Sequence, residues 1–519
     1  MFNASNLRKN SFIILLSALS LTGICLLLLS TSKWGVNVEL EQTYYVFMAH
    51  LFENYAANKE LLGTFLCHFQ PLYPLVLFWG HFTGTNPLEV ARWFNSILFG
   101  FNISLVGIIT NKFTGSARTG LFAALLMLLA SDVLEVHLNP LSEPLFIFFM
   151  LVWLLLFFNY LKDPKLYILI FGSIIVTLAS LTRFAGIPLI ATGLFAILFL
   201  NQERNLINKL FHAVIFISIP ILSLFLYARY SYREYDSWQR HFAIHPVDFL
   251  YLQKTASIFC SWLFSSNIHA STNGKVFLFL AITIFCFIQL FLWHQNRKIL
   301  KNGPERVIFI KFSVFIIVSI YLYLLSLFLA ASFWDADDIW RDWERYLAPV
   351  HALGLIIFGG FISNFFQKAS SLKNDIGKII LSYFFLSYAV GSTLFLIHHY
   401  SSEKVLTNDP LRFSYIIRKI KTMPMEQPIY SNDFQAVYIL GDKSSFLIPC
   451  IENAYTLKKN NKYSNQLSQM TMDLQKKKGL LVYFNNHVDK CVEPMKNLQK
   501  RMPLHLVIQD KYASVFDVQ

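Results

Sequence analysis

The chain has 519 residues, of which 55% are hydrophobic and only 14% are charged, a composition that excludes an ordinary soluble globular protein. We therefore predict a polytopic α-helical membrane protein. The net charge of +13 does not predict a nucleic-acid partner, because the basic residues are spread among hydrophobic segments and do not form one patch.

Hydrophobic segments of the length that crosses about 30 Å of hydrocarbon recur along the chain, and we predict about eleven transmembrane helices. Their approximate ranges are 12–31, 90–110, 117–131, 140–160, 166–182, 184–200, 210–229, 275–294, 308–331, 346–366 and 376–398. The first follows Arg8 and Lys9, as the apolar part of a signal peptide would. Its long apolar run and the lack of an A-x-A cleavage pattern favour a retained anchor.

Lysine and arginine are concentrated in alternate loops, which predicts the orientation of the helices. Segments such as "HQNRKILKNGPER" belong to the loops on the basic side, whereas acids accumulate in the loops on the other side. Because each loop has the charge that its predicted side requires, we expect the N-terminus inside and the C-terminus outside.

Two long outer loops, 32–89 and 230–273, contain the aromatic-rich pieces "YYVFMAHLFENY" and "HPVDFLYLQKTASIFCSWLF". These pieces are too short or too polar to cross a bilayer, and their pattern suits helices that lie in the membrane interface. We expect them to form a cap over the outer side of the membrane domain.

The composition changes near residue 400, where a lysine-rich segment with short apolar runs begins. The runs "PIYSN", "GLLVYFN", "LHLVIQD" and "ASVFDV" predict strands, the last two as a hairpin around "DKY". We therefore divide the chain into a transmembrane domain, 1–399, and a small extracytoplasmic α/β domain, 400–519.

Cysteine usage leaves one question open. Cys450 and Cys491 are the only cysteines of the C-terminal domain, and they could pair in an oxidising compartment or remain two separate buried thiols. No Cys-x-x-Cys pair, His/Cys cluster with metal-ligand spacing, HExxH, GxSxG or glycine-rich phosphate loop appears. We assign no metal ligand and no cofactor, and a divalent metal stays an open alternative.

Acidic side chains stand out at the predicted outer side, where burial near the membrane is costly. In an extended segment Glu39 and Glu41 would point the same way, whereas on a helix they would lie about 200° apart, so that only one of them could face a site. Solvation of the interface is the alternative for both. Glu143 in "SEPLF" begins the fourth span, and it is either a site residue or, with Ser142 and Pro144, part of the helix start.

Two arginines also meet the membrane from the outer side: Arg183 in "LTRFAGIP" and Arg345 in "ERYLAPVHALG". A pair of guanidinium groups can bind a phosphate bidentately, and snorkelling to the interface is the alternative. The spans themselves carry almost no charge at depth. Charges at the outer rim favour chemistry there over transport through the bilayer.

A series of motifs combines these features in one order along the chain. The series is "ELEQTYYVFMAHLFEN", "QPLYPLVLFW", "ARWFNSILFG", "SEPLF", "LTRFAGIP", "ERYLAPVHALG" and "PIYSND". It resembles the GT-C glycosyltransferases, within them the bacterial branch related to protein O-mannosyltransferases (glycosyltransferase family 39, PMT-like) and to the lipid A aminoarabinose transferases. The resemblance covers residues 1–400 and, more loosely, the tail.

The resemblance implies a sugar donor carried on a polyprenyl phosphate and an acceptor hydroxyl on a glycolipid, a polysaccharide or a protein. Transfer would take place on the outer face, with inversion at the anomeric carbon. Such a reaction needs a base for the hydroxyl proton and cationic groups for the departing phosphate. The resemblance also implies a bacterial inner membrane, with the site facing the periplasm or the exterior.

Members of the family typically use as base an aspartate shortly before a tyrosine in the first outer loop. This chain has no aspartate between residues 31 and 88. Glu41, four residues before Tyr45, has the best matching position, and Glu39 is second; Tyr45 is expected to help to bind substrate. Glu143 matches a second outer acid that helps to arrange the site.

The resemblance assigns the remaining candidates to the donor. Arg183 and Arg345 match the arginines of the "TRF" and "ERY" motifs, and Arg341 is a weaker addition to the phosphate site. His68 in "CHFQPLYP" has the position of a further polar site residue in some relatives. Two other classes of function stay open: a lipid-linked sugar transporter or flippase, and a non-catalytic GT-C-like subunit, which the missing aspartate favours.

Overall fold

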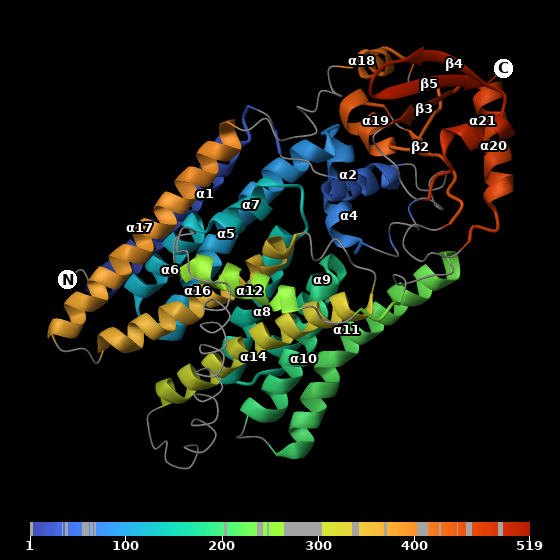
Figure 1. Cartoon of the computed structure of the whole chain (residues 1–519). Coiled ribbons are helices and arrows are strands. Elements are labelled where there is room, and N and C mark those ends of the chain that lie inside the picture. Colours follow the sequence, from blue (N-terminus) through green and yellow to red (C-terminus); the bar gives the residue numbers. More distant parts are fainter. Residues whose placement is uncertain are drawn as a thin grey trace.

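The protein is mostly helical, and its strands gather at the C-terminal end of the chain (Figure 1). The computed structural model describes residues 4–33, 35–36, 40–53, 62, 66, 69–201, 205–235, 242–245, 249–263, 304–334, 342–367, 371–401, 414–424, 427–443, 445–452, 459–485 and 491–518. The helices up to residue 401 pack into one bundle, and the C-terminal part of the chain lies beside α2 (Figure 1).

The bundle consists of long helices joined by shorter ones. In chain order they are α1 (Ala4–Ser30), α2 (Leu40–Glu53), α4 (Leu72–Phe78), η1 (Trp79–Thr83), α5 (Pro87–Thr114), α6 (Ala117–Leu129), α7 (Ser131–Leu138), α8 (Glu143–Lys162), α9 (Leu166–Thr182), η2 (Phe184–Gly186), α10 (Ile187–Phe195), η3 (Ala196–Leu200), α11 (Leu206–Tyr235), α12 (Phe249–Leu263), α14 (Pro304–Phe333), α16 (Trp343–Gln367) and α17 (Ser371–Ser401). The two predicted interfacial pieces are helical, as α2 and α12.

Several of these helices are long and apolar enough to cross a membrane. Within the described part of the chain there are seven: Asn10–Ser30, Pro87–Thr114, Glu143–Lys162, Leu206–Tyr230, Arg306–Phe333, Trp343–Asn364 and Gly377–Tyr400. The pair α6 and α7 is bent by 57° and makes an eighth if it counts as one span. The protein is thus an integral, multi-pass membrane protein.

Seven predicted spans coincide with these helices, whereas three others form shorter ones. The predicted span at 117–131 is the first limb of the bent pair, and those at 166–182 and 184–200 correspond to short apolar helices. The predicted span at 275–294 lies outside the described residues. The total of about eleven spans and the orientation in the membrane stay predictions.

The start and end of α5 follow local sequence rules. The side chain of Asn86 accepts a hydrogen bond from the backbone N–H of Leu88, and Pro87 occupies the first turn, where it lacks only an N–H that a helix leaves unpaired. Gly115 ends the helix at φ 68°, a left-handed conformation that suits glycine. Asn95, which this helix places next to the candidate site, is fully buried.

The C-terminal residues form one five-stranded sheet in the order β2-β1-β3-β5-β4. Its strands are β1 (Ile429–Ser431), β2 (Phe446–Leu447), β3 (Leu480–Phe484), β4 (Leu504–Gln509) and β5 (Ala513–Val518), and its helices are α18 (Tyr415–Lys421), α19 (Phe434–Gly441), α20 (Tyr463–Lys476) and α21 (Met495–Arg501). β1 is parallel to β2 and β3, and β5 is antiparallel to β3 and β4. The predicted strands, including the terminal hairpin, are confirmed; the domain boundary stays a prediction.

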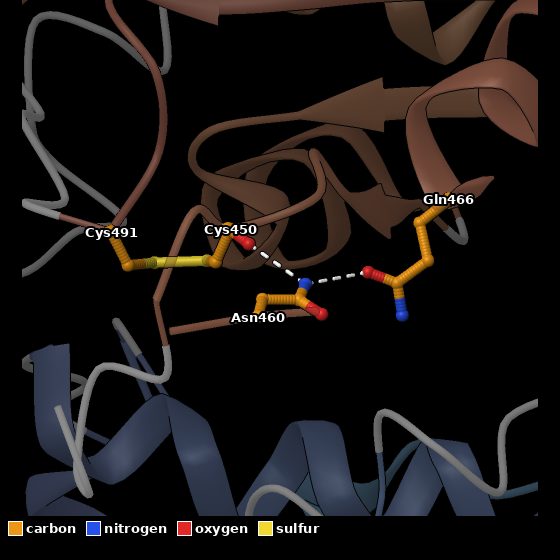
Figure 2. Close-up of a disulfide and its surroundings, with 4 residues drawn as sticks. All are labelled: Cys450, Asn460, Gln466 and Cys491. Carbon is orange, nitrogen blue, oxygen red and sulfur yellow. Dashed lines mark hydrogen bonds between the residues drawn. A yellow bond between two sulfur atoms is a disulfide. The ribbon is translucent and has the colours of Figure 1, made fainter. Parts of the chain in front are cut away.

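Cys450 and Cys491 form a disulfide, so the alternative of two separate thiols is wrong (Figure 2). The side-chain amide of Asn460 donates one hydrogen bond to the backbone carbonyl of Cys450 and another to Gln466, both 2.8 Å long (Figure 2). The bond joins the segment after β2 to the segment before α21 and closes a loop with a sequence separation of 41.

Loss of this disulfide is expected to destabilise the C-terminal sheet. A bond that closes a loop of this length restricts the unfolded chain, and its removal costs roughly 2–5 kcal/mol. Cys450→Ser should therefore lower the temperature at which the purified protein unfolds in detergent. Cys25→Ser is the control, since Cys25 lies on α1 outside the bond. An equal number of alkylated thiols in the denatured protein with and without reductant would contradict the assignment.

Candidate functional site

The candidate site is built around the first turn of α8. Ser142 is the N-cap residue, Glu143 is the first helical residue and a proline follows in the first turn, as the sequence predicts. Ser142 makes no capping hydrogen bond with its side chain. Its hydroxyl donates to the hydroxyl oxygen of Tyr45 over 3.0 Å and accepts from Arg183 over 2.9 Å. The preferences of the first helical turn thus explain why Ser142 and Glu143 stand at the start of α8, but they do not explain the contacts of their side chains.

Two arginines meet at one oxygen of Glu143. Arg183 places Nη1 2.7 Å from Oε1, and Arg345 places Nε 2.8 Å from the same oxygen. The carboxylate is fully buried, whereas the side chains of Arg183 and Arg345 are 8% and 12% exposed. A second carboxylate, Asp342, lies 3.3 Å from Nη1 of Arg345 and is 31% exposed. Both arginines thus share the buried carboxylate of Glu143, and Arg345 also pairs with Asp342.

The ring of Tyr346 lies close to both guanidinium groups. Its ring centroid lies 5.0 Å from Cζ of Arg183 and 4.9 Å from Cζ of Arg345, distances at which a cation is attracted to an aromatic face. Tyr323 on α14 donates its hydroxyl proton to the backbone carbonyl of Tyr346 over 2.8 Å. The arginine pair is thus held by α8, α9, α14 and α16 together.

Arg183 reaches Glu143 because α9 ends directly before it. The residue has an extended backbone, φ −153° and ψ 144°, between α9 and η2. The chain then folds back so closely that a Cβ on Gly186 would lie 2.5 Å from the backbone nitrogen of Ser180. Glycine is therefore needed at this turn, and the turn directs Arg183 toward α8.

Tyr45 joins α2 to this cluster. Its ring packs against Phe69 and Tyr73, with centroids 5.3 and 5.4 Å away, and Tyr73 shares a hydrogen bond of 3.3 Å with Asn95 of α5. Burial raises the pKa of the Tyr45 hydroxyl to about 12. Because this group keeps its proton at neutral pH, it can bind a ligand but is not a base there.

The structure brings together four of the predicted site residues: Glu143, Arg183, Arg345 and Tyr45. Glu41 lies in α2, one helical turn before Tyr45, and its side chain is outside the described part of the chain. Glu39, His68 and Arg341 also lie outside the described residues, so their assignment stays a prediction.

Sequence reasoning missed three further members of the cluster: Ser142, Tyr346 and Tyr323. Ser142 precedes Glu143 in "SEPLF", and Tyr346 follows Arg345 in "ERY". Each could have been predicted as a site residue, because it is a polar or aromatic neighbour of a predicted charged one. Tyr323 had no such signal, because it is one aromatic residue in a long apolar helix.

A second polar group lies deeper along α16. His351 has Nδ1 2.8 Å from Asp132 Oδ1 of α7 and Nε2 2.7 Å from the hydroxyl of Tyr388 on α17, while Trp262 of α12 stacks on its ring at 4.3 Å. Asp132 directly follows the predicted span at 117–131, and the prediction of almost no charge within the spans stays a prediction. The bend between α6 and α7 turns this acid toward α16, which periodicity alone does not reveal.

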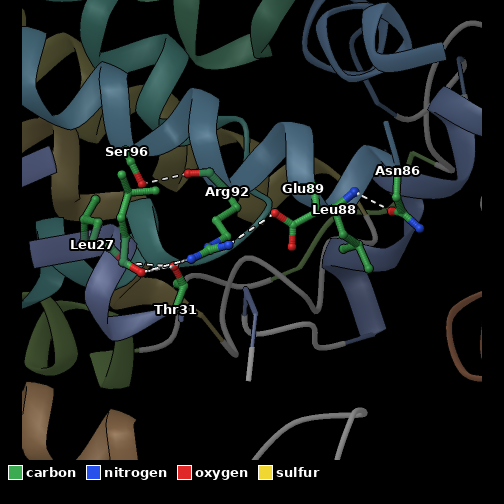
Figure 3. Close-up of polar contacts among 8 residues, drawn as sticks. Leu27, Thr31, Asn86, Leu88, Glu89, Arg92 and Ser96 are labelled. Atoms are coloured by element: carbon green, nitrogen blue, oxygen red, sulfur yellow. Dashed lines mark hydrogen bonds and ion pairs between the residues drawn. The ribbon is translucent and has the colours of Figure 1, made fainter. Parts of the chain in front are cut away.

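Arg92 offers a contrast to the arginines of the site (Figure 3). It lies near the start of α5, donates from Nε to Thr31 over 2.9 Å and from Nη2 to the backbone carbonyl of Leu28 over 3.1 Å, and pairs with Glu89 at 3.2 Å. A cation bound to the carboxyl end of α1 stabilises that helix terminus. Arg92 thus has a structural explanation, and it supplies a control for the site arginines.

Among the described residues, no group of three or more His, Cys, Asp or Glu side chains is arranged to hold a metal ion.

Comparisons with known proteins bear on the fold. No protein-family model and no curated protein matches the sequence. ArnT from Cupriavidus metallidurans, bound to undecaprenyl phosphate, has a similar structure with a TM-score of 0.52 and 13% sequence identity over 98% of both chains. The apo state of the same protein gives 0.50 and 12%, again over 98% of both chains. The chain therefore has the fold of these ArnT structures, which agrees with the fold that the resemblance of its sequence predicts.

Proposed function

We propose that this protein is an inverting membrane glycosyltransferase. It would move a sugar from a polyprenyl phosphate to a hydroxyl of a glycolipid, a polysaccharide or a protein on the outer face of a bacterial inner membrane. The observation that carries the proposal is the meeting of Arg183 and Arg345 at Glu143 in a GT-C fold.

Two guanidinium groups that lie close together can bind an anionic ligand. Arg183 and Arg345 share Oε1 of Glu143, and Arg345 also pairs with the partly exposed Asp342. A phosphate beside these two groups would be stabilised by charge-assisted hydrogen bonds. The similar structure of ArnT holds undecaprenyl phosphate, and a lipid-linked phosphate is the ligand that we propose here.

Glu41 is the proposed base. It precedes Tyr45 by one turn of α2, and Tyr45 is hydrogen-bonded to Ser142 beside Glu143. Glu143 itself is an unsuitable base, because both arginines neutralise its charge. We assign to Glu143 the task of holding the two arginines in place.

The proposed reaction exchanges one bond at the anomeric carbon. The acceptor oxygen forms a bond to this carbon, while the bond from the carbon to the phosphate oxygen breaks and its electron pair remains on the polyprenyl phosphate. The hydroxyl proton passes to Glu41. Arg183 and Arg345 would stabilise the charge that develops on the departing phosphate. Attack from the face opposite the phosphate inverts the anomeric configuration.

A direct test is incubation of the purified protein with radiolabelled polyprenyl-phosphate sugars and candidate acceptors. We expect label to pass to the acceptor with release of polyprenyl phosphate. Lipid-linked sugar that is bound but never transferred to any acceptor would support the non-catalytic subunit. Movement of intact donor across proteoliposome membranes would support the transporter, for which the pair of Asp132 and His351 is the relevant group.

A further inference from the structure

The helix that carries Glu41 also contacts the C-terminal sheet domain. Thr43 and Phe47, one turn apart on α2, face α19: the Thr43 hydroxyl donates to Oε1 of Gln435, and the Phe47 ring packs on Phe434 with centroids 4.3 Å apart. Thr43 is fully buried and Gln435 is 5% exposed. Because a buried hydrogen bond in a low-dielectric contact tolerates little displacement, this contact restricts sliding of α2.

Aromatic stacking extends the same contact. His50, the next residue along this face of α2, stacks on Tyr438 of α19 with ring centroids 4.7 Å apart and an interplanar angle of 28°. Phe47 also contacts the Tyr438 ring, at 6.0 Å. Phe47, Met48 and Leu51 of α2 form a buried cluster that includes Phe434 of α19. The contact thus runs along most of the length of α2.

The sheet in turn holds α19 firmly. Asp433 caps the helix by accepting a hydrogen bond from the backbone N–H of Ala436 over 2.9 Å. The buried side chain of Asn432 exchanges two hydrogen bonds with the backbone of Phe484 in β3, of 2.9 and 2.7 Å. The start of α19 is therefore fixed to the centre of the sheet. Because α2 packs on α19, its position relative to the sheet is fixed as well.

The other face of α2 belongs to the candidate site. Tyr45, two residues from Thr43 and so about 200° away around the helix, is bound to Ser142, and Glu41 is one turn before Tyr45. A small rotation or tilt of α2 would move this face relative to the arginine pair. Misplacement of a reacting group by about 1 Å can lower a rate by about 100-fold.

We propose that α19 sets the position of α2, so that Gln435 and Phe434 are positioning residues for the reaction and the C-terminal domain is part of the catalytic unit. The inference rests on the proposed function. It predicts that the effects of variants in this contact appear in kcat, because the arginines that would bind the donor phosphate are untouched.

The test uses full-length protein in nanodiscs and four variants. Thr43→Val and Gln435→Leu remove the hydrogen bond while keeping the side-chain volume. Thr43→Ser keeps the hydroxyl and should recover most of the loss. Tyr430→Phe is the matched control, since it removes a hydrogen bond of the same domain, from the Tyr430 hydroxyl to Asp473, away from α2.

Thr43→Val and Gln435→Leu are expected to lower kcat at least about tenfold and to leave the KM for donor within about twofold. Amide hydrogen exchange in residues 40–53 should become faster in both variants and stay unchanged in Tyr430→Phe. Unchanged exchange in residues 40–53 would overturn the inference even if no transfer activity were found. Unchanged kcat in a wild-type enzyme that does transfer sugar would overturn it while leaving the proposed function intact.

Discussion

Glu41→Gln is expected to lower the rate of sugar transfer by roughly 10²–10⁴-fold, the usual contribution of a positioned general base. Glutamine has nearly the shape of glutamate but cannot take the acceptor proton. Because α2 is held by contacts of Thr43, Phe47 and Tyr45, the variant should insert and fold as the wild type does. The measurement is kcat with a radiolabelled polyprenyl-phosphate donor, together with the thermal unfolding temperature in detergent.

Glu39→Gln is the matched control for this prediction. It makes the same chemical change two residues earlier in the chain, and it should leave transfer near the wild-type rate. If Glu39→Gln abolished transfer and Glu41→Gln did not, Glu39 would replace Glu41 as the base. If both single variants and the double variant kept the wild-type rate, neither glutamate would be the base.

Arg345→Lys is expected to weaken donor use by roughly 10- to 100-fold in kcat/KM, as the loss of one charge-assisted hydrogen bond of about 1.5–3 kcal/mol requires. Lysine keeps the positive charge beside Glu143, so the buried carboxylate remains compensated. It lacks the planar fork that packs on Tyr346 and that would bind two phosphate oxygens at once. The variant should therefore fold and lose affinity for the polyprenyl phosphate.

Arg92→Lys is the control, because Arg92 is also a partly buried arginine with two hydrogen bonds and an acidic partner (Figure 3). It should affect the unfolding temperature slightly and the KM for donor not at all. Titration with polyprenyl phosphate, followed by the shift in unfolding temperature, measures binding without turnover. Equal binding by wild type and Arg345→Lys would remove Arg345 from the phosphate site.

The sequence determined the features that depend on local pattern. Apolar length identified the seven helices that can span a membrane, and short apolar runs identified β1, β3, β4 and β5 of the C-terminal sheet, whereas β2 was not predicted. It also singled out Glu143, Arg183 and Arg345, because a charge at the end of an apolar segment is costly enough to be noticed wherever the helices pack.

Only the tertiary structure decided which of these charges meet. Glu143 and Arg345 come from α8 and α16, and Arg183 directly follows α9. The periodicity within one helix does not predict how it packs on another.

The disulfide and the pair of Asp132 and His351 also depend on tertiary structure. The sequence positions of two cysteines do not give the distance between them, and Asp132 reaches His351 through the bend after α6. The contact of α2 with α19 is of this kind too: it joins the two ends of the chain, and its buried side chains are ordinary in sequence. The pattern of residues within one helix or strand predicts which of its faces is buried. Which other element covers that face depends on packing between residues that are far apart in the sequence.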